Sequence, residues 1–163
     1  MGALSDEHER AVRVASVYGV LVEDRDCSDN AWDGRTIALR YGGRLRPVAD
    51  IIHDLAHWLV CARSRRSLRD FGLGTGPDGG EGAERVVSAR TANDEEARAS
   101  LLGIAIQRDL GLGNWSAALL DHSWGSLLDP VGGHLRHLRW LHDRGFMRDG
   151  MAVPPEERVA DAA

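Results

Sequence analysis

The chain has 163 residues, of which 43% are hydrophobic and 28% charged, and its formal net charge is -5. This length fits a single domain with a substantial core, and the acidic balance lacks the basic excess of a nucleic-acid-binding protein. All 20 basic residues are arginine, which excludes any mechanism that needs a lysine.

Cysteine content and hydropathy bear on the cellular compartment. Cys27 and Cys61 are too few and too far apart for a disulfide framework, which favours a reduced protein. No apolar run reaches membrane-spanning length, and residues 1–19 carry acids where a signal peptide has an apolar centre. We therefore expect a cytoplasmic protein that binds neither membrane nor nucleic acid, and the sequence leaves its oligomeric state open.

The N-terminal part of the chain predicts one helix and a small sheet. Apolar residues recur at helical spacing from Ser5 to Tyr18, and Gly19 ends the pattern. Residues 20–23 and 35–41 have the composition of short strands. We expect these strands to pack beside the helix that follows them.

Residues 47–60 predict a helix that is buried on several sides. Pro47 suits the first turn, Asp50 lies near the positive end of the helix dipole, and apolar residues cover most of the circumference. His53 and His57 are spaced i, i+4, with Cβ atoms about 5–6 Å apart, so both imidazoles can reach one metal ion. The alternative is a buried helix with two hydrogen-bonded core histidines.

Arginines and a glycine-rich loop follow this helix. The arginines either complement the helix C-terminus or form an anion-binding rim, in which Arg66 would contact a substrate; they are Arg63, Arg65, Arg66 and Arg69. Residues 75–82 predict a loop, at a place where a substrate lid would lie.

A capping box at residues 91–94 predicts the start of a helix that runs to Leu110. Glu95 and Glu96 would fall in its first turn, where acids complement the helix dipole. Opposite the two histidines, one of them is also the best available third ligand. The apolar side that holds Leu102 favours Glu95 for this role.

The C-terminal part predicts two more helices, one from Asn114 to His122 or Trp124 and one along a leucine stripe that ends at Gly145. His134 and His137 flank this stripe, and we expect both to be surface histidines. Residues 154–163 predict an extended or disordered tail, so the expected domain covers residues 1–153.

Four short motifs within residues 50–80 together resemble the elongation factor P hydroxylase family: His53-Asp54-Leu55-Ala56-His57-Trp58, Arg65-Arg66, Asp70-Phe71-Gly72 and Pro77-Asp78-Gly79. The resemblance implies Fe(II)-dependent hydroxylation of a protein or small-molecule substrate, with the iron held by His53, His57 and a carboxylate. Asp54 replaces the glutamate of that family's His-Glu-x-x-His motif.

A second resemblance, to the ImmA/IrrE-type zinc peptidases, covers more of the chain. It comprises a helix, two short strands, the His-x-x-x-His helix and a Glu-Ala helix. The Glu-Ala pair is Glu96-Ala97 here, which favours Glu96 over Glu95 as the third ligand. Both resemblances imply a zincin-like α+β domain, mostly helical, with a small sheet beside the His-Asp-x-x-His helix.

Two imidazoles and one carboxylate leave positions of one divalent ion open, as in non-haem Fe(II) oxygenases and zinc hydrolases. In a zinc hydrolase, Asp54 must be the catalytic general base, and aspartate is one methylene shorter than glutamate. In an oxygenase, Asp54 can orient a ligand instead. We therefore favour Fe(II) over Zn(II), and a non-catalytic zincin-like binding domain is the third hypothesis.

Overall fold

The computed structural model describes residues 2–25, 31–40, 47–74, 84–115, 133–154 and 157. The elements in chain order are α1 (Gly2–Val17), β1 (Leu21–Arg25), β2 (Ala31–Trp32), β3 (Thr36–Arg40), α2 (Pro47–Val60), the 3-10 turns η1 (Arg63–Arg65) and η2 (Arg69–Gly72), α3 (Ala89–Leu110), α6 (Gly133–Asp143), β4 (Met147–Arg148) and β5 (Met151–Ala152). Helices combined with small sheets confirm the expected mixture of α and β structure. The loop at 75–82, most of the helix expected after residue 114 and most of the tail lie outside the described residues.

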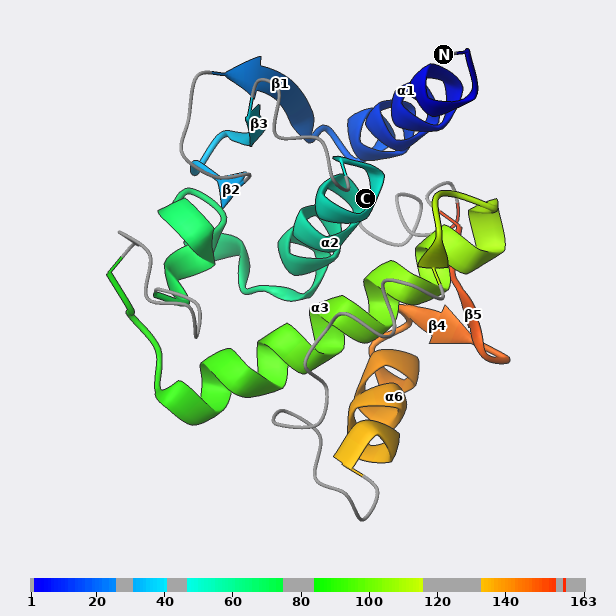
Figure 1. Cartoon of the computed structure of the whole chain (residues 1–163). Helices are drawn as coiled ribbons and strands as arrows, with labels where there is room; N and C mark the ends of the chain where they lie inside the picture. The colour runs from blue at the N-terminus through cyan, green and yellow to red at the C-terminus, as the bar shows by residue number, and fades with distance from the viewer. Residues whose placement is uncertain are drawn as a thin grey trace.

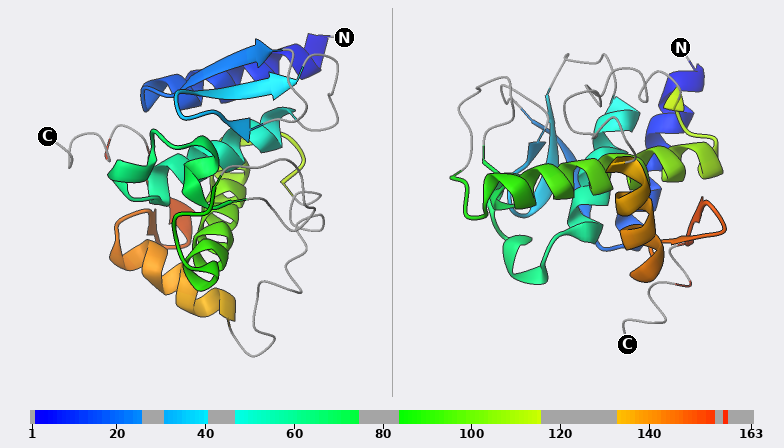
Figure 2. Two further views of the ribbon diagram at one scale, coloured as in Figure 1. Left: turned by 90° about the vertical axis from the view of Figure 1, so that its left-hand side faces the viewer. Right: turned by 90° about the horizontal axis from the view of Figure 1, so that it is seen from below.

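Helix α2 lies in the middle of the molecule (Figure 1, Figure 2). The three-stranded sheet and α1 lie on one side of α2, and α3 packs along its other side. Helix α6 and the β4–β5 hairpin contact α3 in turn. The buried side chains of α2 therefore pack either against α1 and the sheet or against α3.

The sheet has the strand order β1-β3-β2, with β1 parallel and β2 antiparallel to β3. Ile37 of the central strand is in register with Val22 of β1 and Trp32 of β2. Residues 36–39 are all buried, as expected of a strand that is paired on both edges and covered by helices. Strand β2 was not predicted, because two residues are too few to show a strand alternation.

Helix α2 confirms the predicted bounds and the predicted burial. It begins at Pro47 and ends at Val60. Four of its apolar side chains have no exposed surface, namely Ile51, Ile52, Leu55 and Ala56. Their positions cover several sides of the helix, so packing against both neighbouring layers holds it in place.

Helix α3 begins earlier than the predicted capping box, so that prediction was wrong. Its N-cap is Ser88, whose Oγ accepts a hydrogen bond of 3.1 Å from the backbone N–H of Thr91. Ser88 is extended (φ -62°, ψ 153°) and supplies a hydroxyl acceptor three residues before Thr91. As a consequence, Glu95 and Glu96 lie beyond the first turn, where the helix dipole no longer accounts for their presence.

The C-terminal part contains the predicted helix and an unpredicted hairpin. Asp149 (φ 52°) and Gly150 (φ 78°) join β4 to β5. Two consecutive positive φ angles characterise the type I′ turn, for which Asp-Gly is a preferred sequence. Among the described helices, none is both long and apolar enough to cross a membrane.

Candidate metal centre

Helix α2 presents His53 and His57 on one face, one turn apart. Their Nε2 atoms lie 3.1 Å from each other, and the rings meet edge to face with centroids 4.6 Å apart. The His57 side chain is only 5% exposed, whereas that of His53 is 21% exposed. His53 therefore marks the side of the pair that is more open to solvent.

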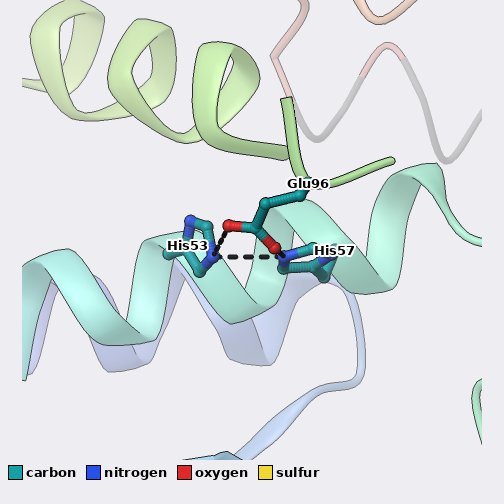
Figure 3. Close-up of side chains that lie close together, drawn as sticks. All are labelled: His53, His57 and Glu96. Carbon is teal, nitrogen blue, oxygen red and sulfur yellow. Dashed lines mark hydrogen bonds and ion pairs between the residues drawn. The ribbon is translucent and has the colours of Figure 1, made fainter. Parts of the chain in front are cut away.

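Glu96 reaches this pair from α3, and Figure 3 shows the three side chains pointing toward one another. Its Oε1 lies 3.2 Å from Nε2 of His53, and its Oε2 lies 2.9 Å from Nε2 of His57. All three groups are electron-pair donors, so the arrangement requires either protons or a metal cation between them.

The spacing of these donors suits a single ion. Ligand atoms that are each about 2.1 Å from one ion stand about 3.0–3.4 Å apart at octahedral or tetrahedral angles. The observed separations, 2.9–3.2 Å, are close to this range. His53, His57 and Glu96 could therefore hold a metal ion, and two imidazoles with one carboxylate are a suitable donor set for Fe(II) or Zn(II).

The electrostatic environment keeps Glu96 ionised. Burial by itself would raise the pKa of this carboxyl, but the charge and hydrogen bonds of His57 and His53 hold the pKa well below its usual value. The carboxylate can therefore act as a ligand at neutral pH without first losing a proton.

Glu95 has a different partner, although it is the adjacent residue. Its Oε2 forms a buried ion pair with Nη2 of Arg65, and the Arg65 and Glu95 side chains are 12% and 7% exposed. Successive residues on a helix point about 100° apart, so only one of two neighbours can face α2 directly. The structure brings Glu96 to the histidines and Glu95 to η1.

Asp54 follows His53 on α2 and is partly buried. Burial raises the pKa of its carboxyl to about 7; His53 opposes this rise, while Asp50, Asp70 and Glu96 add to it. Asp54 is not among the three side chains whose donor atoms converge. Its position after the first histidine leaves it available as a base or as an orienting group, and its catalytic role stays a prediction.

The arginines after α2 have separate environments. Arg65 is paired with Glu95, whereas Arg69 has its Nε 3.6 Å from Asp70. The guanidinium of Arg66 lies over the ring of Trp58, 3.6 Å from the ring centroid, and burial lowers its pKa. Trp58 is the residue after His57, so Arg66 is near the histidine helix, and its contact with a substrate stays a prediction.

His137 is buried, contrary to our expectation of a surface histidine. It is 1% exposed, whereas His134 is exposed. The buried face of α6 runs through His137 and Leu141, four residues apart, and Leu135 is 62% exposed. Leu141 and Leu138 of the leucine stripe do pack inward, so the buried face is turned only partly away from the stripe, toward His137. This rotation depends on the neighbouring surface of α3, which could not be known from the sequence.

A feature that the sequence did not reveal is the contact of Phe71 with the site. The Phe71 ring stacks on His57 with centroids 5.5 Å apart and on Trp32 with centroids 5.3 Å apart. The sequence shows Asp70-Phe71-Gly72 only as a short motif. Nothing local in that motif indicates which side chain its aromatic ring meets.

His53, His57 and Glu96 are the one group of three or more potential ligands that the described residues bring together. A hollow between α1 and β1 contains none of them and is lined by His8, Glu9, Val12, Arg13, Val22 and Asp24. Comparisons with protein-family models, curated proteins and solved structures gave no match to this chain.

Proposed function

We propose that the protein is a metal-dependent enzyme of the 2-His-1-carboxylate type and that it catalyses Fe(II)-dependent hydroxylation, like the elongation factor P hydroxylase family that its motifs resemble. The observation that carries the proposal is the convergence of His53, His57 and Glu96 from two helices to within 3.2 Å of one another. Three protein ligands on one side of an ion leave its other positions for oxygen and substrate.

The surroundings of the site favour the hydroxylase family over the peptidase family. Two of the motifs that carry the first resemblance contact the donor set or its helix. Arg65 pairs with Glu95 beside Glu96, and Phe71 stacks on His57. The resemblance to the peptidases includes neither of these two elements.

Each residue has a separate role in this proposal. His57 holds the ion from the interior, and the more exposed His53 and Glu96 lie toward the side from which a substrate would enter. Fe(II), when bound, supplies the activation of dioxygen that hydroxylation requires. Asp54 would orient the neighbouring ligand His53, and Arg66, held over Trp58, would contact a substrate carrying negative charge.

A zinc-dependent peptidase or amide hydrolase of the ImmA/IrrE type is the second candidate. It is supported by Glu96, followed by Ala97, being the carboxylate that meets the two histidines. In this case Asp54 would be the general base. Asp54→Asn would then lower the rate by about 10²–10⁴-fold, whereas a ligand-orienting role predicts a loss of roughly 10–100-fold.

Metal reconstitution tests the proposal. The protein is purified without chelator, its metal content is measured, and the metal-free form is loaded anaerobically with Fe(II) or with Zn(II). Nitric oxide, a substitute for oxygen, should give an iron–nitrosyl EPR signal with the Fe(II) form, because an open coordination position is required. Oxygen uptake and product formation are then measured with lysate proteins and peptides as substrates.

The outcomes separate three hypotheses. Stoichiometric iron with oxygen-dependent modification of a substrate supports the hydroxylase. Peptide cleavage that requires zinc, and is lost in Asp54→Asn, overturns it in favour of the hydrolase. A wild-type protein that takes up neither ion overturns both and supports a non-catalytic binding domain.

A further inference from the structure

Residues 70–72 form a turn in an unusual backbone conformation. The φ angles of Asp70, Phe71 and Gly72 are 46°, 54° and 68°. Two residues with side chains thus adopt the left-handed conformation, which is unfavourable and persists only where surrounding contacts hold it. A Cβ on Gly72 would lie 2.5 Å from Cγ2 of Val86, so the turn is also closely packed.

The turn places the Phe71 ring between two other rings. Phe71 is 2% exposed and lies 5° from the plane of Trp32 and 19° from the plane of His57. Trp32 is itself held by a hydrogen bond of 2.7 Å from its Nε1 to the carbonyl oxygen of Arg66. The stack therefore connects a fixed ring in the sheet to an imidazole of the donor set.

Stacking supplies a restraint that His57 otherwise lacks. A metal-bound histidine usually donates a hydrogen bond from its second ring nitrogen, and that bond fixes the orientation of the ring. Nδ1 of His57 is buried, and none of the residues that the structure describes forms a hydrogen bond with it. The face of Phe71 is the planar surface against which the imidazole is oriented.

Arg65 connects this turn to the helix that carries the third donor. Its Nη1 donates a hydrogen bond of 2.6 Å to the carbonyl oxygen of Phe71, and its Nη2 pairs with Glu95, next to Glu96. A displacement of the turn would therefore act on His57 through the ring and on Glu96 through α3.

We propose that Phe71 is a positioning residue of the metal centre, which orients the His57 imidazole for metal binding, and that Arg65 keeps the turn in register with α3. This inference rests on the metal centre of the proposed function, and it assigns to a strained turn the role that a hydrogen bond usually has. It applies equally to an iron and to a zinc site.

Binding of Co(II) alone tests the role of Phe71, because cobalt reports both affinity and ligand geometry through its visible absorption. Phe71→Leu removes the planar ring and keeps an apolar side chain, whereas Phe71→Tyr retains the ring. Phe146→Leu is the matched control, since Phe146 is a buried aromatic that stacks on Trp140, with centroids 5.7 Å apart, away from the donors.

Phe71→Leu is expected to weaken Co(II) binding by roughly 10–100-fold and to change the absorption envelope. Phe71→Tyr should bind Co(II) with the wild-type affinity and give the wild-type spectrum. Phe146→Leu should change neither the affinity nor the spectrum, even if its melting temperature falls as far as that of Phe71→Leu. If folded Phe71→Leu binds Co(II) as tightly as a wild-type protein that binds it well, the positioning role is overturned, but the metal centre is not. Wild-type protein that binds no cobalt overturns the metal centre as well.

A measurement on the wild type remains decisive if Phe71→Leu does not fold. In the Zn(II)-loaded protein, NMR should show nuclear Overhauser contacts between the ring protons of Phe71 and those of His57, because the two rings stack. Absence of these contacts would overturn the stacking role.

Discussion

Helix α3 places an acidic residue near histidine at two contacts, one with α2 and one with α6, and the two contacts differ in kind. Toward α2, Glu96 lies 2.9 Å and 3.2 Å from two histidines. Toward α6, Asp94 lies 3.9 Å from His137, while Arg136 approaches the same Asp94 oxygen to 2.8 Å and Arg98 lies 3.8 Å from the other oxygen.

The difference shows what distinguishes a potential metal site from a structural contact. At the α3–α6 contact, arginine neutralises the carboxylate, and a single imidazole stands beyond hydrogen-bond distance. At the α2–α3 contact, two imidazoles and a carboxylate converge. Histidine and acid in proximity are therefore insufficient; the number of convergent donors and the partners of the acid decide.

The largest expected effect is the loss of metal binding on removal of an imidazole at the α2–α3 contact. His53→Ala and His57→Ala should each abolish stoichiometric binding, because two protein donors replace three, while the apolar core around α2 preserves the fold. Metal analysis after gel filtration, with circular dichroism as the folding control, measures this. His137→Gln should retain full occupancy, and full occupancy in His57→Ala would refute the site.

Separate substitution of the two adjacent glutamates by glutamine should distinguish an effect on metal affinity from an effect on stability. Glu96→Gln should sharply lower metal affinity, because an amide is a poorer ligand than a carboxylate. Glu95→Gln should lower affinity far less, because its amide oxygen can still accept the hydrogen bond from Arg65 that keeps the turn in register with α3. It should nevertheless cost about 3 kcal/mol of stability, since Arg65 loses its counter-charge. Isothermal titration and urea unfolding measure the two quantities; similar profiles for both variants would contradict the assignment.

Asp54 should make the metal-free protein less stable at alkaline pH. Its pKa is raised to about 7 from 3.8, so the folded state binds the proton more tightly than the unfolded state. Its contribution to stability is complete below about pH 4 and is lost as the pH rises through about 7. With chelator present, Asp54→Asn should gain stability over wild type at pH 8 but not at pH 4. Parallel urea midpoints for both proteins at both pH values would count against this.

His137 should change the pH dependence of stability less than Asp54 does, and it should make the protein less stable at acidic pH. Burial, and then the charge of Arg136, lower its pKa below 6.5, so protonation favours the unfolded state. Its contribution to stability is complete above its ordinary pKa and decreases as the pH falls below about 6.5. His137→Gln should flatten the stability profile between pH 7 and pH 5, measured by thermal unfolding. An unaltered profile would show that other groups dominate there.

The sequence predicted those parts of the fold that depend on local patterns. Pro47 and the apolar periodicity specified α2, and the i, i+4 spacing placed His53 and His57 on one face. The choice between Glu95 and Glu96 required the register of α3, which depends on Ser88 as the N-cap and on a partner 30 residues away in the sequence, Arg65.

Two further features lay beyond any local pattern. Phe71 adopts a conformation that is unfavourable for a residue with a side chain, and its contacts with His57, Trp32 and Arg65 help to hold it there. His137 is buried because α6 packs on α3 by the face that contains it, a relation between segments that a single helix does not encode.

The acidic turn of α3 has a consequence for tolerance to insertions and deletions. Asp94, Glu95 and Glu96 are consecutive, yet they pair with Arg136 of α6, Arg65 of η1 and the histidines of α2. A shift of α3 by one residue would exchange all three pairings together, so the helix register is specified redundantly. One residue inserted or deleted between the N-cap and this turn would remove the third metal donor, the buried ion pair and the attachment of α6 in a single step.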